Sequence, residues 1–531
     1  MMDLPLNAWM LFRNAARHHP HVEIVSRRDG VSERITYNDF ASRTQQLMHA
    51  LDGLGVETGA RVSTLAWNHA GHLEAYFAIP CTGRVIHTAN IRLSPEDLAY
   101  VLGHAEARAL LVDPEFLPVI EQVAAKLPLL EHIVVFGSAV PPTTLANVVA
   151  YEDLLAGRPV TYDAPHIAET TPLGLCYTSG TTGRPKGVVY THRSTFLHAL
   201  AVTSGAAMSI GPSDTVLPQV PMFHASAWGM PYASVAVGAK IVLYAGALDA
   251  ADYVDTLIDE HVTITAGVPT VWLAVADELS ARGATIPSLR HIVCGGAQPP
   301  RALIDRFRRE FGITVVQAWG MTETSPLASM AWPQPHMRDW PAEQLLDTVR
   351  TQAGLPLPGV EVDIRDDTGA SVPFDGSSMG ALHVRGPWVV KDYDGGAGAD
   401  CFTDDGWFNT GDVAIGSPAG YFVIADRTKD LIKSGGEWIS SVDMEAAIMA
   451  MAEVAEAAVI AMPDPKWQER PLACVVLRPG CTVTLESVRA HLEAHGFARW
   501  QLPARVEFID AVPRTAVGKF DKKVLRTQFV A

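Results

Sequence analysis

The run Tyr177–Val188 contains the residue types that bind a polyphosphate. Its glycines let the backbone approach an anion, its Thr and Ser hydroxyls donate hydrogen bonds, and Lys186 adds a positive charge. Apolar segments, Leu173–Cys176 and Val188–Tyr190, flank the run, so we expect a loop that joins two strands. These residues together predict an oxyanion-binding loop.

Two other interpretations compete with this one. A P-loop has Gly-Lys followed by Ser or Thr, whereas Pro185 precedes Lys186 here and Gly187 follows it, so we exclude a P-loop. Composition alone also fits a flexible surface loop. The complete run favours phosphate binding, because it resembles the phosphate-loop signature of the adenylate-forming superfamily. This superfamily includes acyl-CoA synthetases, luciferases and the adenylation domains of peptide synthetases.

A second block, Pro221–His224, resembles the same superfamily. The resemblance implies that His224 lies by the carboxylate end of an acyl substrate. Without the resemblance, a His that follows an apolar run is more often a packed core residue. We therefore expect His224 near the substrate and assign it no acid or base chemistry.

A third block, Gln317–Thr324, resembles the adenine- and phosphate-binding motif of the superfamily. The chain has Trp319 where the superfamily usually has Tyr, and an indole face can also stack on adenine. The resemblance places Thr322 at the α-phosphate and Glu323 on Mg²⁺. One carboxylate suffices for this ion, because phosphate oxygens and water fill its other positions.

The C-terminal part contains further blocks that resemble the superfamily. They imply that Asp412 accepts hydrogen bonds from both hydroxyl groups of a ribose with help from Arg427, and that Lys429 is a hinge. The segment Ser434–Ser440 resembles the one that lines the pantetheine tunnel. A single lysine near a C-terminus is usually solvated, but Lys519 lies in a Pro-Arg-Thr-x-x-Gly-Lys string that resembles the one with the catalytic lysine.

The resemblance thus implies four sets of site residues. The catalytic set is Lys519, Thr178, Glu323 and His224, and Thr178 and Glu323 are also the expected metal ligands. The residues expected to bind ATP or CoA are Thr178, Ser179, Gly180, Thr181, Thr182, Gly183, Lys186, Gly295, Gly296, Ala297, Gln317, Ala318, Trp319, Gly320, Met321, Thr322, Asp412, Arg427, Lys433, Gly435, Gly436 and Trp438. The expected acyl pocket is formed by His224, Trp228, Val268, Gly295, Gly296, Ala297 and Met321.

The expected acyl pocket is apolar and offers no partner for a second charge. An amino acid substrate would require a buried acidic side chain for its ammonium group. We therefore expect an aliphatic or small hydrophobic acid. The segments Lys433–Ser440 and Pro463–Pro471 look most like those of bacterial medium-chain fatty acyl-CoA ligases and methylthiopropionate ligases.

The composition restricts the class of partner and compartment. The net charge of −17 argues against nucleic acid or an anionic membrane as the main partner. The six cysteines form no CxxC pair and mostly lie in apolar segments, which favours core packing over disulfides or zinc. The N-terminus has no signal-peptide pattern, and the apolar segment Ala225–Leu248 contains Pro231 and Lys240, which favours buried sheet and helix over a membrane span. We expect a cytoplasmic protein, with a homodimer among its assemblies.

The alternation of strand and helix patterns predicts an α/β fold. Strand-like segments such as Arg61–Ala66 and Val85–Thr88 alternate with helical ones such as Ser94–His104, which is typical of a mostly parallel sheet flanked by helices. At 531 residues the chain exceeds one ordinary domain. We expect an N-terminal domain over residues 1–428, with a small β subdomain at about 354–428, and a small mobile α+β domain over 429–531.

The resemblance implies an acyl-CoA synthetase of fatty acid metabolism that uses ATP, Mg²⁺ and coenzyme A. The acid would first form acyl-AMP and pyrophosphate, and the CoA thiol would then replace AMP after the C-terminal domain rotates. Three alternatives share parts of the pattern: an adenylating enzyme that loads a carrier protein in trans, a luciferase-like oxygenase, and a non-catalytic nucleotide-binding protein. No residue identifies an emitter pocket, and the joint presence of Lys519, Glu323 and Asp412 disfavours the third alternative.

Overall fold

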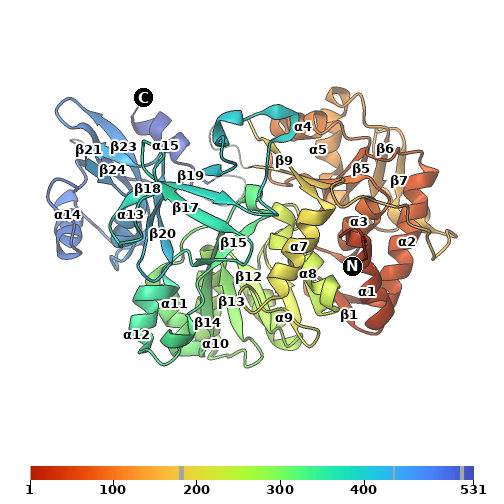
Figure 1. The fold of residues 1–531 in the computed structure, drawn as a ribbon, viewed down its shortest axis with the longest axis horizontal. Coiled ribbons are helices and arrows are strands. Elements are labelled where there is room, and N and C mark those ends of the chain that lie inside the picture. The colour runs from red at the N-terminus through yellow and green to blue at the C-terminus, as the bar shows by residue number, and fades with distance from the viewer. Residues whose placement is uncertain (1, 179–183, 435–436, 515–519, 531) are drawn as a thin grey trace. The chain divides into compact units, whose positions relative to one another are not determined.

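The computed structural model describes residues 2–178, 184–434, 437–514 and 520–530 (Figure 1). The chain forms two compact units. The first comprises Met1–Thr178, Pro185–Glu361 and Arg385–Ala399, and the second includes Val362–Val384 and Asp400–Ala531. Each unit has its own sheets, and the predicted site residues are divided between them.

A seven-stranded sheet of the first unit contains the strand that precedes the predicted phosphate loop. Its order is β7-β6-β5-β3-β4-β8-β9, parallel except for the final antiparallel pair. The strands are β3 (Arg61–Leu65), β4 (Val85–Thr88), β5 (Ala109–Val112), β6 (His132–Val135), β7 (Val148–Ala150), β8 (Pro172–Tyr177) and β9 (Gly187–Thr191). Helices α3 (Ala70–Cys81), α4 (Pro95–His104) and α5 (Leu117–Val123) alternate with them. The predicted α/β fold is confirmed.

A nine-stranded sheet forms the other half of the first unit, in the order β16-β15-β14-β13-β12-β10-β11-β1-β2. Its strands are β1 (Glu23–Arg28), β2 (Val31–Thr36), β10 (Thr215–Pro218), β11 (Lys240–Tyr244), β12 (Ile264–Gly267), β13 (His291–Cys294), β14 (Thr314–Gly320), β15 (Leu327–Met330) and β16 (Leu355–Pro356). Helices α9 (Ala250–Asp259), α10 (Pro269–Arg282) and α11 (Arg301–Arg306) connect strands of this sheet. Parallel pairing from β10 to β14 places the carboxyl ends of β13 and β14 side by side.

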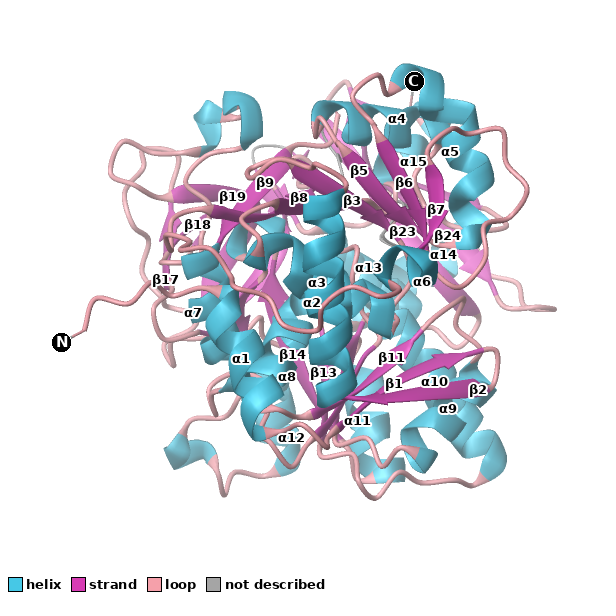
Figure 2. Ribbon diagram, turned by 90° about the vertical axis from the view of Figure 1, so that its right-hand side faces the viewer, coloured by secondary structure: helices cyan, strands magenta, loops and turns pink. Residues whose placement is uncertain are grey.

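Helices fill the space between the two sheets of the first unit (Figure 2). They are α1 (Ala8–His18), α2 (Tyr37–Gly53), α3, α7 (His192–Thr203) and α8 (Met230–Val237). Their apolar faces form one continuous core with residues of both sheets, such as Ile24, Val62 and Ile86. Buried aromatic side chains of α1, α2 and α3, namely Phe12, Phe40 and Phe77, pack edge-on or tilted against one another.

Capping residues fix the starts of these helices. Thr36 accepts a hydrogen bond from the Asp39 backbone, and the Asp39 side chain accepts one from Thr36, which forms a capping box at α2. The Ser94 side chain accepts a hydrogen bond from the Asp97 N–H and caps α4. Such caps satisfy backbone groups that a helix end otherwise leaves unpaired, which explains why the helix boundaries follow the sequence signals closely.

The segment Ala225–Trp228 adopts a conformation that the hydrophobic pattern does not predict. Its four residues have φ between 44° and 56°, so they form a left-handed turn without glycine. Such a conformation costs about 1–2 kcal/mol per residue. All four side chains are buried, and Trp228 is only 8% exposed. The prediction of buried sheet and helix holds for α8 and β11, which follow this turn.

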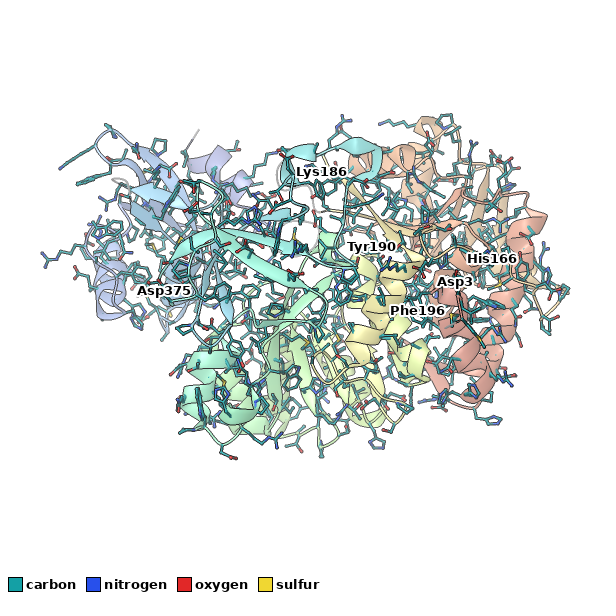
Figure 3. The ribbon with its side chains drawn as sticks, viewed as in Figure 1. Asp3, His166, Lys186, Tyr190, Phe196 and Asp375 are labelled. Atoms are coloured by element: carbon teal, nitrogen blue, oxygen red, sulfur yellow. The ribbon has the colours of Figure 1, made fainter. Side chains whose placement is uncertain are left out.

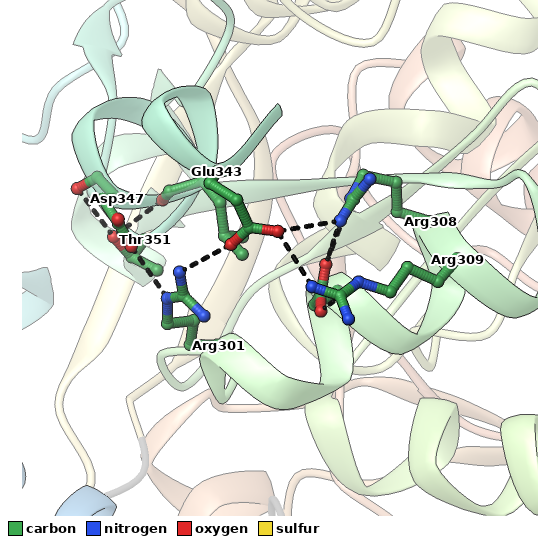
Figure 4. Close-up of polar contacts among 8 residues, drawn as sticks. Arg301, Arg308, Arg309, Glu343, Asp347 and Thr351 are labelled. Carbon is green, nitrogen blue, oxygen red and sulfur yellow. Dashed lines mark hydrogen bonds and ion pairs between the residues drawn. The ribbon is translucent and has the colours of Figure 1, made fainter. Parts of the chain in front are cut away.

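Glu343 forms ion pairs with neighbouring arginines on the surface of the first unit (Figure 4). This carboxylate lies 3.0 Å from the Arg301 guanidinium, 3.2 Å from Arg308 and 2.9 Å from Arg309. About half of the Glu343 side-chain surface is exposed. Exposed pairs of this kind contribute little to stability.

The second unit contains two smaller sheets. Strands β17 (Glu361–Arg365), β18 (Met379–Arg385), β19 (Phe408–Gly416) and β20 (Phe422–Arg427) pair in that order. Strands β21 (Ile432–Ser434), β22 (Glu437–Ile439), β23 (Val454–Asp464), β24 (Gln468–Leu477) and β25 (Arg505–Phe508) form the second sheet, with helices α13 (Ser441–Met449), α14 (Leu485–Ala494) and α15 (Lys522–Phe529). The predicted small β subdomain and α+β C-terminal part are confirmed.

A buried ion pair holds two helices of the second unit together. The Lys522 ammonium at the start of α15 lies 2.6 Å from the Glu445 carboxylate of α13 and donates to the Ser441 hydroxyl at 2.6 Å. The Ser441 backbone N–H in turn donates to Asp426 at the end of β20, at 2.6 Å. Burial raises the pKa of Asp426, a shift that the positive charge of Lys522 opposes.

The cysteines are free thiols, as the sequence predicts, and Cys81, Cys176, Cys294 and Cys474 are buried. Among the helices of the described residues, none combines the length and the apolar character needed to cross a membrane.

Candidate functional site

The two strands that flank the predicted phosphate loop form an antiparallel hairpin. Strands β8 and β9 pair in register up to Tyr177 and Gly187. Beyond them, the Thr178 N–H donates to the Lys186 carbonyl at 2.9 Å, and the Lys186 N–H donates to the Thr178 hydroxyl at 3.2 Å. The two strands predicted to flank the loop are therefore present. The predicted ligands Ser179, Gly180, Thr181, Thr182 and Gly183 lie outside the described residues.

The hairpin is tied to the block that contains Thr322 and Glu323. Tyr190 of β9, labelled with Lys186 in Figure 3, donates from its hydroxyl to the Thr322 carbonyl at 2.8 Å. Thr322 and Glu323 lie in a 3₁₀ turn, Thr322–Thr324, which follows β14 and is buried. The structure thus brings together two motifs that lie more than a hundred residues apart in sequence. Burial raises the pKa of Tyr190, so its hydroxyl stays protonated and able to donate.

Tyr393 connects the two motifs a second time, and the sequence analysis did not identify it. Its hydroxyl donates to Glu323 Oε1 at 2.6 Å, and the Lys186 ammonium lies 4.8 Å from the centroid of its ring. The N–H of Val390 donates to the Glu323 carbonyl at 2.8 Å. A single Tyr between two Asp residues has no spacing that signals a site, so only the fold could reveal this contact.

The carboxyl ends of β13 and β14 carry residues predicted to bind ATP. Cys294 pairs with Gln317 in parallel register, so Gly295 follows next to Ala318. A Cβ added to Gly295 would lie 2.8 Å from the Ala318 carbonyl oxygen, so only glycine fits there. Trp319 is half-buried, while the buried Gln317 amide oxygen has no hydrogen-bond partner among the described residues.

Four residues of the predicted acyl pocket lie close together at these strand ends. The same added Cβ at Gly295 would lie 3.0 Å from Trp228 Cη2, and one at Gly296 would lie 3.2 Å from Val268 Cγ1. The left-handed turn that follows His224 therefore directs the Trp228 indole toward the two glycines. The structure therefore brings Trp228, Val268 and the glycine pair together.

The remaining residues of these predicted sets lie on the same elements. His224 is half-buried and directly precedes the left-handed turn. Ala297 is exposed after the glycine pair, whereas Gly320 at the end of β14 and Met321, which leads into the 3₁₀ turn, are half-buried. The Met321 N–H donates to the Pro326 carbonyl at 3.1 Å, which fixes the backbone before Thr322.

In the second unit, Asp412 and Arg427 face each other across β19 and β20. Arg427 Nε lies 2.7 Å from Asp412 Oδ1, and the Asp412 side chain is 3% exposed. Lys429 lies in the turn between β20 and β21, where burial lowers its pKa against the opposing effect of Asp430. A turn position is compatible with the predicted hinge.

Of the residues predicted to contact CoA, the structure describes Lys433 and Trp438, and both are exposed on the second unit. The Lys433 ammonium lies 5.1 Å from the ring centroid of Trp438, which is 44% exposed. Gly435, Gly436 and the predicted catalytic Lys519 lie outside the described residues.

Comparison with known proteins agrees with the arrangement of the site residues described above. Residues 11–394 match the AMP-binding enzyme family, and residues 443–519 match the AMP-binding enzyme C-terminal domain. The chain therefore belongs to the AMP-binding enzyme family. Within this adenylate-forming superfamily it belongs with the acyl-CoA ligases, to which it is similar over its whole length.

Three relatives and one solved structure illustrate this similarity. The chain is 47% identical to a long-chain-fatty-acid–CoA ligase of Thermus thermophilus, with 100% of this chain and 96% of the relative covered. It is 40% identical to a medium-chain-fatty-acid–CoA ligase of Ectopseudomonas oleovorans (100% and 97% covered). It is also 40% identical to a 3-methylmercaptopropionyl-CoA ligase of Ruegeria lacuscaerulensis (100% and 98% covered). The crystal structure of the anthranilate CoA ligase AuaEII with anthranoyl-AMP superposes with a TM-score of 0.87 at 27% identity, covering 100% and 98% of the chains.

Proposed function

We propose that this AMP-forming acid–CoA ligase activates a medium-chain fatty acid or a related aliphatic acid with ATP and then transfers the acyl group to CoA. The broader class, a ligase for fatty or related acids, follows from the family to which the chain belongs. The observation that supports the chemistry is the buried connection of Lys186, Thr322 and Glu323 by Tyr190 and Tyr393. This connection places a cation, a hydroxyl and a carboxylate on neighbouring turns of the first unit.

In the first half-reaction, a carboxylate oxygen of the acid attacks the α-phosphorus of ATP. A bond forms between this oxygen and phosphorus, the bond to the bridging oxygen of the β-phosphate breaks, and pyrophosphate leaves. Lys186 and the Thr322 hydroxyl would offset the charge on the phosphates, and Lys519 would bridge the acid and the α-phosphate. Positioning and fixed charges of this kind supply most of the acceleration in phosphoryl and nucleotidyl transfer.

The site fits a Mg²⁺ ion that arrives with the nucleotide. Within the described residues, no group of three or more His, Cys, Asp or Glu side chains is arranged to hold a metal ion without a substrate. Glu323 offers one carboxylate and Thr178 one hydroxyl, and this donor set suits Mg²⁺ when phosphate oxygens complete the shell. The bound ion would neutralise charge that develops on the departing pyrophosphate.

In the second half-reaction, the CoA thiol loses its proton and its sulfur attacks the acyl carbonyl carbon, so that a carbon–sulfur bond forms, the bond to AMP breaks, and AMP and a proton are released. We propose that the C-terminal domain, residues 429–531, turns about Lys429 relative to residues 1–428 between the two steps. Lys519 would withdraw, and Lys433, Gly435, Gly436 and Trp438 would approach the pantetheine. Asp412 and Arg427 would hold the ribose in both steps.

The acid is inferred from the apolar cluster at Trp228. The indole, Val268 and the glycine pair offer dispersion contacts and no charged partner for a second ionised group of the substrate. An indole of this size also occupies space that a long chain would need. These contacts support a medium-chain aliphatic acid.

The proposal is tested with acids of graded chain length, ATP and either CoA or a carrier protein. We expect AMP and acyl-CoA in equal amounts, with an optimum at medium chain length. Trp228→Ala should move this optimum to longer acids, since it removes the indole that occupies part of the pocket. Preference for a carrier protein over CoA would favour the carrier-loading alternative, and nucleotide binding without AMP formation would favour a non-catalytic protein.

A further inference from the structure

Tyr393 occupies the space between two groups of opposite charge in the first unit. Its ring face lies below the Lys186 ammonium, at 4.8 Å from ring centroid to nitrogen, while its hydroxyl donates to Glu323 at 2.6 Å. The side chain is only 5% exposed. One aromatic residue therefore contacts both the predicted phosphate-binding cation and the predicted metal-binding carboxylate.

The chain around Tyr393 is built to hold this position. The next residue, Asp394, forms two hydrogen bonds of 2.8 Å with the Arg61 guanidinium. Gly398 has φ +67°, and a Cβ there would lie 2.7 Å from the Lys186 nitrogen and 2.9 Å from Tyr393 Cδ2. A side chain at position 398 would thus displace both partners. A bidentate ion pair and a close glycine fix Tyr393 from two sides.

The two contacts use different parts of the side chain. The ring face has negative electrostatic potential and attracts an ammonium, whereas the hydroxyl proton is positive and attracts a carboxylate. Without this separator, the half-buried Lys186 and the buried Glu323 would gain by pairing directly, because the attraction between opposite charges is stronger where water is partly excluded. Such a pair would have to break each time a nucleotide bound.

We propose that Tyr393 is a positioning residue that keeps Lys186 and Glu323 apart, so that the ammonium remains available to phosphate and the carboxylate to its divalent cation. This inference rests on the proposed function and adds to it a residue that acts through two others. Its specific consequence is energetic coupling: the effect of the Tyr393 hydroxyl should depend on the charge at Glu323.

The test is a double-mutant cycle with Tyr393→Phe and Glu323→Gln, in which the α,β-methylene analogue of ATP is titrated by calorimetry with and without Mg²⁺. Tyr151→Phe is the matched control, because Tyr151 is buried in the same unit and donates to the buried Glu74 carboxylate at 2.5 Å. Thermal unfolding of each variant shows whether the fold is retained. Tyr393→Leu removes both contacts at once.

Tyr393→Phe should weaken binding of the Mg²⁺ complex about tenfold, the effect expected for one lost hydrogen bond to a charged group. Binding of the metal-free analogue should change less than about twofold. In the Glu323→Gln background the same substitution should have almost no effect. Tyr393→Leu should also weaken binding of the metal-free analogue, since Lys186 then loses its ring contact.

An equal loss from Tyr393→Phe in both backgrounds, or a loss no larger than that of Tyr151→Phe, would overturn the inference. If Tyr393→Phe is not recovered folded, the metal-free titration of Tyr393→Leu decides, and unchanged affinity there would equally overturn it. Binding of the analogue requires neither acid nor CoA. A wild-type protein that binds it but makes no acyl-CoA would contradict the proposed function alone.

Discussion

The two units hold their predicted site residues in different ways. In the first unit, Thr322 and Glu323 are buried in a turn, and hydrogen bonds from Tyr190 and Tyr393 fix this turn to the hairpin of Lys186. Among the predicted site residues of the second unit that the structure describes, only Asp412 is buried, while Lys433 and Trp438 lie on the surface. Groups that stabilise charge in the transition state do so best when rigid surroundings hold them in place. Groups that must arrive for one step and leave for the next are better placed on a mobile surface.

Among the variants that distinguish the two units, we expect the largest effect from Lys519→Ala. Loss of a contact to the reacting phosphate should slow formation of acyl-AMP by on the order of 10²-fold or more. Thioester formation from synthetic acyl-AMP should stay near the wild-type rate, because this step does not use the lysine. Rapid-quench measurement of each half-reaction checks this prediction. Equal losses in both steps would remove the functional distinction between the units.

Lys522→Met tests how firmly the second unit is held. The substitution leaves the Glu445 and Asp426 carboxylates buried without their cation, so the free energy of unfolding should fall by about 3 kcal/mol. Lys523→Met is the matched control, since that neighbouring side chain is exposed. Denaturant unfolding followed by circular dichroism measures both variants. A similar loss in the two variants would show that the buried pair is unimportant.

Asp412→Asn should raise the KM for ATP about tenfold, because a neutral amide binds the ribose hydroxyls and Arg427 less strongly than a carboxylate does. The KM for the acid should not change. Asp363→Asn is a matched control, since Asp363 pairs with Arg365 at 2.7 Å in the same sheet without a predicted ligand role. If both variants raise the KM for ATP equally, the ribose assignment of Asp412 is wrong.

The smallest effect is expected from Glu343→Gln on the surface of the first unit. The three arginines around Glu343 remain solvated after the change, so the melting temperature should stay within the error of calorimetry. A clear drop that disappears at high salt would show that this exposed network, and not only the buried contacts, stabilises the first unit.

The helices and strands could be predicted well because the local sequence signals agree with the fold. The cap at Thr36, the strand before the phosphate loop and the glycine pair after β13 all lie where their patterns indicate. The left-handed turn Ala225–Trp228 was not predictable, since its residue types carry no preference for positive φ and only tertiary burial offsets the strain.

The same distinction applies to the candidate site. The motif resemblance identified Glu323 and Lys186. Their contacts to the same side chain, that of Tyr393, confirm that the two residues lie close together. It could not select Tyr393, because a positioning residue acts through contacts that the fold creates rather than through a sequence motif. Roles at Lys519 and at the glycines of Ser434–Ser440 stay predictions.

The most direct test of the account is exchange of labelled pyrophosphate into ATP by the wild-type protein without CoA. If the first half-reaction is complete in itself, label should enter ATP whenever a medium-chain aliphatic acid is present, and not when the acid is omitted. Exchange that occurs only after CoA is added would contradict a separate adenylation step. Absence of exchange with every acid, in protein that still binds ATP, would contradict the assignment as a whole.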